Sequence, residues 1–187
     1  MQIKNLIIAI FLNLLFLISA HGMTIEEAYR AIPHRQTTFN AASARMSDEE
    51  AAYLKEFFKL VDLAIVERIQ TLAWLQTSGE YGASFEHYEN SIDDLLYQFN
   101  ALEVPKHLKN VNKLVSQAIR EQKSYFQNWQ MLLEKGQQFK FQPRHPHIIG
   151  SHQKLVQAYR QLMRVFPRED KHNHQAFFDH LCALDFI

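Results

Sequence analysis

Glycine and proline are scarce in this chain, and the few that occur divide it into long uninterrupted stretches. The 187 residues include five glycines and five prolines. Because these two residues are the strongest local interruptions of regular structure, such sparse placement favours helices. The apolar residues between the breaks recur at steps of three and four, and no stretch shows the sustained alternation of a strand. The sequence therefore predicts an all-α fold.

Four stretches carry apolar seams with the spacing of long helices. We expect them over residues 47–79, 84–102, 105 or 106–135, and 151–166, followed by a short fifth helix over about 168–184. The seam residues are Leu54, Phe58, Val61, Ile65, Leu72 and Leu75; Phe85, Tyr88, Ile92, Leu95, Phe99 and Leu102; Leu108, Val111, Val115, Ala118, Gln122, Tyr125, Trp129 and Leu132; Leu155, Tyr159, Leu162, Met163 and Phe166; and Phe177, Leu181 and Leu184. Such seams are buried best when neighbouring helices pack together, which predicts an up-down antiparallel helical bundle of four long helices plus a short C-terminal helix.

Polar residues and breakers mark the expected helix ends. Ser47 is followed three residues later by Glu50, the pattern of an N-terminal capping box. Pro105 stops the second helix and opens the third, because proline disfavours helix at the preceding residue and is well placed in a first turn. Gly136 is expected to end the third helix and Pro167 the fourth.

The first 20 residues have the layout of a secretory signal peptide. They carry one positive charge at Lys4, an apolar stretch from Leu6 to Ile18, and small residues before a cleavage point after Ala20. The apolar stretch is shorter than the roughly 20 residues that span a bilayer as a helix. We therefore expect cleavage, no stable membrane span afterwards, and a periplasmic or secreted protein.

The rest of the chain is expected to form one domain with an N-terminal extension. Residues 21–46 should contain a short helix near 25–31 and then an irregular strap over 32–39, while residues 47–187 form the helical bundle. No internal repeat or interdomain linker is recognisable.

Charge and cysteine content exclude several classes of function. The chain has 20 Lys and Arg against 20 Asp and Glu, interspersed along its length, so it lacks the basic tract expected of a nucleic-acid-binding protein. Cys182 is the single cysteine, which rules out an intrachain disulfide. We expect it to be a small buried residue between Leu181 and Leu184, with an intermolecular disulfide or a metal thiolate as alternatives.

Motifs for cofactors are absent from the sequence. There is no Cys-x-x-Cys-His for c-type haem, and only one Glu-x-x-His spacing, from Glu169 to His172, where a di-iron bundle needs two. The zinc-protease, phosphate-loop and Gly-x-Ser-x-Gly motifs are also missing. We expect no cofactor, apart from a possible transition metal.

Histidines crowd the C-terminal third, and imidazole is the commonest transition-metal ligand. The candidate metal ligands are His145, His147, His172 and His174, with Pro146 expected to hold the first two in an extended segment. Residues two positions apart on a helix are separated by about 200° around its axis. This weakens the case that His172 and His174 share one metal ion. The alternative is that all four are ordinary polar side chains of a loop and a helix end.

Two irregular segments carry a second candidate site, for a carboxylate or phosphate ligand. His34 and Arg35 lie in the strap, and Arg144 and His145 lie in the connection over residues 137–150. Guanidinium and imidazole donors would suit such an anion if the two segments meet. Otherwise each arginine caps a helix or pairs with a nearby acid.

Two polar residues, Arg68 and Gln122, occupy seam positions. A charged group on a seam must find a partner or reach water, so we expect Arg68 to fix the helix register either through a buried ion pair, with Asp93 or Asp94 as candidate partners, or by snorkelling to the surface. A ligand cavity inside the bundle is the alternative.

These observations favour an exported helical-bundle protein of non-enzymatic type that binds a protein partner or small ligand. A metal-binding or metal-handling protein that uses the C-terminal histidines is the alternative, and a hydrolase comes third.

Overall fold

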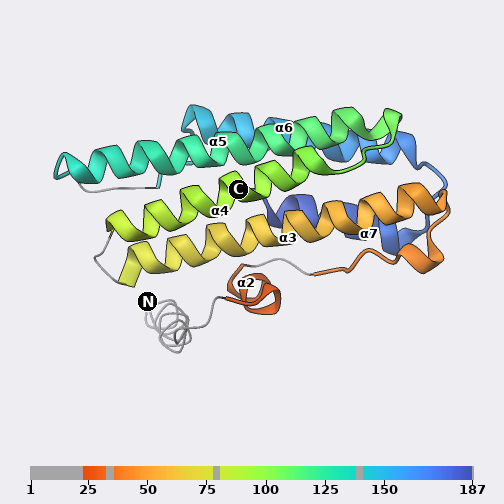
Figure 1. Cartoon of the computed structure of the whole chain (residues 1–187), viewed down its shortest axis with the longest axis horizontal. Helices are drawn as coiled ribbons and strands as arrows, with labels where there is room; N and C mark the ends of the chain where they lie inside the picture. Colours follow the sequence, from red (N-terminus) through yellow and green to blue (C-terminus); the bar gives the residue numbers. More distant parts are fainter. Residues whose placement is uncertain (1–22, 33–35, 78–80, 138–140, 187) are drawn as a thin grey trace, which may run out of the picture.

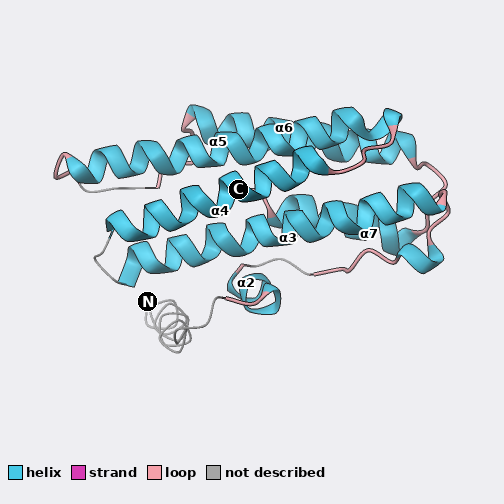
Figure 2. Cartoon of the chain, viewed as in Figure 1, coloured by secondary structure: helices cyan, strands magenta, loops and turns pink. Residues whose placement is uncertain are grey.

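All regular structure in the described part of the chain is helical. The computed structural model describes residues 23–32, 36–77, 81–137 and 141–186. Its α-helices are α2 (Ile25–Ala31), α3 (Asp48–Thr77), α4 (Tyr81–Ala101), α5 (Lys109–Glu134), α6 (Pro146–Val165) and α7 (Lys171–Ala183), and two single 3₁₀ turns are η1 (Ala41–Ser43) and η2 (Lys106–Leu108). Figure 2 shows no strand among these residues, and the predicted all-α class is confirmed for them.

The long helices lie side by side (Figure 1). Along the chain α3 packs on α4, α4 on α5, and α5 on α6. The shorter α7 then packs against both α6 and α3, so the last helix returns to the first long one. The short α2 lies against α3. This arrangement has the four long helices and the short C-terminal helix that the apolar seams predict.

Three contacts define the register between α5 and α6. Asn128 lies against His145, with 2.9 Å between Asn128 Nδ2 and His145 Nε2. Further along, Gln122 Nε2 donates to Ser151 Oγ at 3.1 Å. At the other end the ring of His107 lies 6.3 Å from that of Phe166. Each step forward along α5 is therefore matched by a step backward along α6, so the two helices are antiparallel.

The predicted seams form the core. Phe58, Phe99, Val115, Leu155 and Phe177 are among its buried members. Trp129 and Leu72 are only partly buried, at positions toward the ends of their helices. Because the apolar stripes of five helices meet in one cluster, burial of this surface is the main stabilising contribution to the fold.

The expected caps are also present. Ser47 Oγ accepts from the Glu50 amide at 3.3 Å while Glu50 Oε2 accepts from the Ser47 amide at 2.7 Å, which is a capping box. Gly136 follows α5 with a φ of +70°, and its amide donates to the Leu133 carbonyl at 2.9 Å. Left-handed backbone at that position is why glycine stands there.

Some of the predicted helix starts were wrong. The fourth long helix begins at Pro146 and not at Ser151, because His145 caps it by accepting from the His147 amide at 3.3 Å and proline fits the first helical position. His147 is therefore helical, and the expectation that Pro146 keeps it in an extended segment is wrong. Likewise α4 starts at Tyr81, before Ser84, and α5 starts at Lys109 after a 3₁₀ turn.

Among the described helices none combines the length and the hydropathy needed to cross a membrane. The predicted signal peptide, residues 1–20, lies outside the described residues.

Candidate functional site

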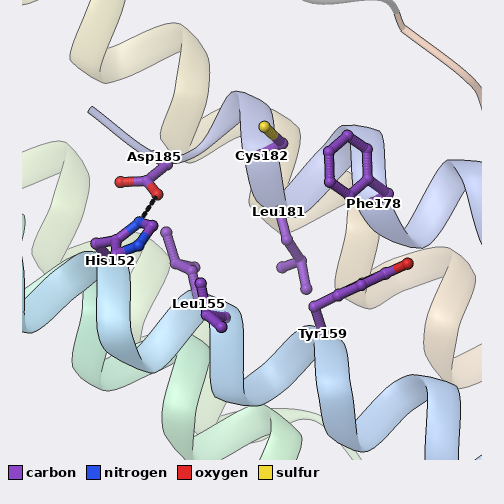
Figure 3. A pocket seen from close by; sticks show the side chains of 8 residues that line it. His152, Leu155, Tyr159, Phe178, Leu181, Cys182 and Asp185 are labelled. Atoms are coloured by element: carbon purple, nitrogen blue, oxygen red, sulfur yellow. Dashed lines mark hydrogen bonds and ion pairs between the residues drawn. The ribbon is translucent and has the colours of Figure 1, made fainter. Parts of the chain in front are cut away.

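A pocket of about 170 Å³ lies between α6 and the C-terminal end of α7 (Figure 3). It is lined by His152, Leu155, Val156 and Tyr159 on one side and by Phe178, Leu181, Cys182 and Asp185 on the other. Both sets recur at steps of three and four, so each forms one stripe along its segment. The two stripes face each other without filling the space between them.

One end of the pocket is polar. His152 Nδ1 lies 2.5 Å from Asp185 Oδ2, and the Asp185 side chain is nearly buried (Figure 3). The Phe186 amide also donates to Asp185 Oδ1 at 2.8 Å, which holds the carboxylate in place. At the other end the rings of Tyr159 and Phe178 meet edge to face at 5.7 Å. The pocket thus combines an apolar body with one oriented polar pair.

A buried positive charge lies close to Asp185. Arg68 is 4% exposed, its Nη2 donates to the Ala183 carbonyl at 2.6 Å, and its guanidinium lies 5.0 Å from the ring centre of Phe186. Burial lowers the pKa of Arg68 to about 10, and the negative charge of Asp185 acts in the opposite direction. Arg68 therefore supports the segment that carries Asp185.

The predicted partner of Arg68 was wrong. Asp93 pairs instead with Lys123, whose Nζ lies 2.7 Å from Asp93 Oδ1. Both polar seam residues bind the end of the chain, since Gln122 Nε2 donates to the Leu184 carbonyl at 2.6 Å. Sequence spacing placed Arg68 and Gln122 in the core but not beside the C-terminal segment, which folds back into the middle of the bundle.

Cys182 lines the pocket and is partly exposed, not fully buried as expected. Burial raises the pKa of its thiol, and the negative charges of Asp185 and Asp179 raise it further. Since the thiolate is the reactive form, this environment does not activate Cys182 as a nucleophile.

A buried polar cluster joins α2, α3 and α7. The Tyr29 hydroxyl donates to Asp62 Oδ1 at 2.8 Å, and His180 Nδ1 lies 2.7 Å from the same oxygen. Burial, followed by the negative charge of Asp62, raises the pKa of Tyr29. Sequence reasoning missed this cluster; its one local signal is an acid beside the seam residue Val61.

The structure brings two of the four candidate metal ligands together. The rings of His145 and His147 lie 5.3 Å apart, and His147 Nδ1 lies 2.7 Å from Glu121 Oε2. Glu121 also accepts from Lys154 at 2.8 Å. Burial lowers the pKa of His145, and the neighbouring His147 adds to that effect.

The other two candidates lie at the far end of α6. His172 Nε2 lies 2.9 Å from the Thr38 carbonyl, and His174 Nε2 lies 2.8 Å from the Phe166 carbonyl. The length of α6, about 30 Å at 1.5 Å per residue, separates them from His145 and His147. Across the described ranges no three His, Cys, Asp or Glu side chains are grouped so that they could hold a metal ion.

Two residues of the candidate anion site, His34 and Arg35, lie outside the described residues. Arg144 is exposed, next to His145. The described part of the strap runs along the start of α7, where Phe39 stacks 6.0 Å from Phe177. Residues of the connection before α6 lie instead near the end of the chain, where the rings of Phe141 and Phe186 are 6.3 Å apart.

Comparisons of the chain with protein-family models, with curated proteins and with solved structures found no match.

Proposed function

We propose that this chain is an exported, non-enzymatic helical bundle that binds a small ligand in the pocket between α6 and α7. The observation that supports binding is an apolar pocket with one polar pair, His152 and Asp185, at one end. Ligand sites are typically concave and mostly apolar, with a few polar groups that orient the ligand.

The size of the pocket limits the ligand. A cavity of roughly 150 Å³ lined by apolar side chains is known to hold benzene, and this pocket measures about 170 Å³. We infer a ligand of about one aromatic ring, or a short aliphatic chain, that bears a hydroxyl or amine within reach of Asp185. One aromatic side chain of a partner protein has similar dimensions and is the alternative occupant.

Binding can be tested by titrating the protein with phenol, benzylamine or toluene while the NMR signals of the Leu155 and Leu181 methyl groups are recorded. Phenol or benzylamine should bind more tightly than toluene, because only the first two can reach the His152–Asp185 pair. Val156→Trp should fill the pocket and abolish binding, whereas Gln157→Trp, on the exposed side of the same helix, should leave it unchanged. If none of the three probes binds, or Val156→Trp binds as well as the parent, the proposal fails.

Export rests on the pattern of residues 1–20 and is tested separately. The protein is expressed with its full leader in a bacterial host, and the envelope fraction is analysed by intact mass and N-terminal sequencing. We expect a mature protein that begins at His21. Recovery of the uncleaved chain from the cytosol would contradict this part of the proposal.

Transition-metal binding is the second candidate, and the proximity of His145 to His147 favours it. Metal analysis of the untagged protein should then find copper, nickel or zinc that is lost in a double variant with both residues changed to Ala. The matched control changes His172 and His174 to Ala, which should retain the metal. Absence of stoichiometric metal, or equal loss in both variants, would reject this candidate.

A further inference from the structure

Charge is segregated between helices, although the whole chain has no net charge. The 21 residues of α4 include four acids and no Lys or Arg. The 20 residues of α6 include Lys154, Arg160 and Arg164 and no acid. A neutral protein arranged in this way has one surface with a distinct positive potential.

Four cations form a basic patch on the outer face of α5 and α6, composed of Lys109, Lys113, Arg160 and Arg164. The register of the two antiparallel helices places Lys109 level with Arg164 and Lys113 level with Arg160. All four side chains are exposed. On each helix they lie opposite buried seam positions, so both pairs share the outward face.

Within the part of the chain that the structure describes, the four patch residues form no ion pair, whereas two other lysines of the same two helices do. Lys154, on α6, binds Glu121 at 2.8 Å, and Lys123, on α5, binds Asp93 at 2.7 Å. Those two lysines link helices. The four patch residues repel one another without such compensation, and an anionic partner would relieve that repulsion.

Apolar side chains lie beside the basic patch. Val156 is one turn before Arg160 on α6, and Ile149 is two turns further back on the same side and 39% exposed. Phe178 of α7 is 45% exposed and contacts Tyr159. A soluble polyanion would engage the cations alone, whereas a lipid surface offers both anionic headgroups and an apolar interior.

We propose that the outer face of α5 and α6 docks on an anionic lipid surface, with Lys109, Lys113, Arg160 and Arg164 against the headgroups and Ile149 and Phe178 at the apolar boundary. This goes beyond the ligand pocket, because none of the four patch residues lines it, although Phe178 borders both the pocket and the proposed docking surface.

Co-sedimentation with phosphatidylcholine vesicles, with and without phosphatidylglycerol, tests the proposal. We expect binding only to the anionic vesicles, weakening as salt is added. Arg160→Gln with Arg164→Gln should reduce the affinity about thirtyfold, since each basic residue near such a surface contributes about fivefold. The control, Lys55→Gln with Lys59→Gln on exposed positions of α3, removes the same charge and should change the affinity little.

A second variant separates lipid docking from general attraction to anions. Ile149→Ser should weaken vesicle binding and leave retention on heparin unchanged, and circular dichroism checks that each variant is folded. Equal losses in the α6 and α3 double variants would show that only net charge matters and would overturn the proposal. Binding to heparin or duplex DNA without binding to anionic vesicles would also overturn it. The same holds if the protein binds none of these three anionic surfaces.

Discussion

Asp62 and Glu121 show how single carboxylates connect helices in this protein. Asp62 is buried and accepts from Tyr29 while it contacts His180, so it links α3 to both α2 and α7. Glu121 is partly exposed and links α5 to Lys154 and His147 of α6. Because Asp62 is buried, its loss should cost much stability, whereas solvent screening limits the contribution of Glu121 to stability.

Replacing Asp62 by Ala should lower the free energy of unfolding by about 3 kcal/mol or more, because it leaves the buried His180 and Tyr29 groups without their shared acceptor. Tyr29→Phe, which removes one donor, should cost about 1 kcal/mol. Urea denaturation measures both. Lys59→Ala, exposed on the same helix, serves as the control and should stay within about 0.5 kcal/mol of the parent. A similarly small effect for Asp62→Ala would contradict the assigned role.

Replacing Glu121 by Gln should destabilise the protein in a pH-dependent way. The hydrogen bond from Lys154 holds the pKa of Glu121 below its usual value, against a smaller opposing effect of burial. Stability from such a carboxylate is present above its unfolded pKa, about 4.3, and is lost as pH falls through the lower folded pKa. The parent should therefore have the higher Tm at pH 7, and the difference should disappear in acid. A difference that grows toward low pH would refute this account; Glu86→Gln, exposed on α4, is the control.

Helix ends in this chain depend on local backbone chemistry. Gly136 adopts a φ of +70° after α5, and no atom lies within 4 Å of the position a Cβ would take. The start of α6 depends on His145 and Pro146 in the same local way. In both places a few neighbouring residues decide where a helix ends or begins.

Gly136→Ala should lower the free energy of unfolding by about 1 kcal/mol, because the cost comes from the left-handed backbone and not from a clash. Gly136→Asn should cost less, since asparagine tolerates that conformation. Urea denaturation of the two variants gives the comparison. If Ala and Asn are equally destabilising, backbone conformation is not the cause.

At the scale of the whole molecule, α7 closes the bundle. It packs on α6 and α3, and the carbonyls of its last residue, Ala183, and of Leu184 accept hydrogen bonds from Arg68 and Gln122. The buried apolar residues of the helices form one continuous cluster. A single core of this kind is expected to unfold cooperatively.

The two tryptophans allow that cooperativity to be tested. Trp74 is on α3 and Trp129 is on α5, so Trp74→Phe and Trp129→Phe each leave one fluorescent probe in a different helix. For each variant, urea transitions followed by fluorescence and by far-ultraviolet circular dichroism should coincide. Within one variant, separate midpoints for the two signals would show that the helices unfold as independent units.

Local sequence patterns were enough to predict the helices, the seams and most caps, because periodicity and capping depend on residues a few positions apart. The tertiary structure decided which groups meet: the carbonyl that Arg68 binds, the cluster around Asp62, the pocket beside Asp185, and the level at which Lys113 lies beside Arg160. These contacts depend on which helices become neighbours and in what register. The packing of whole seams sets both, and no short stretch of sequence contains that information.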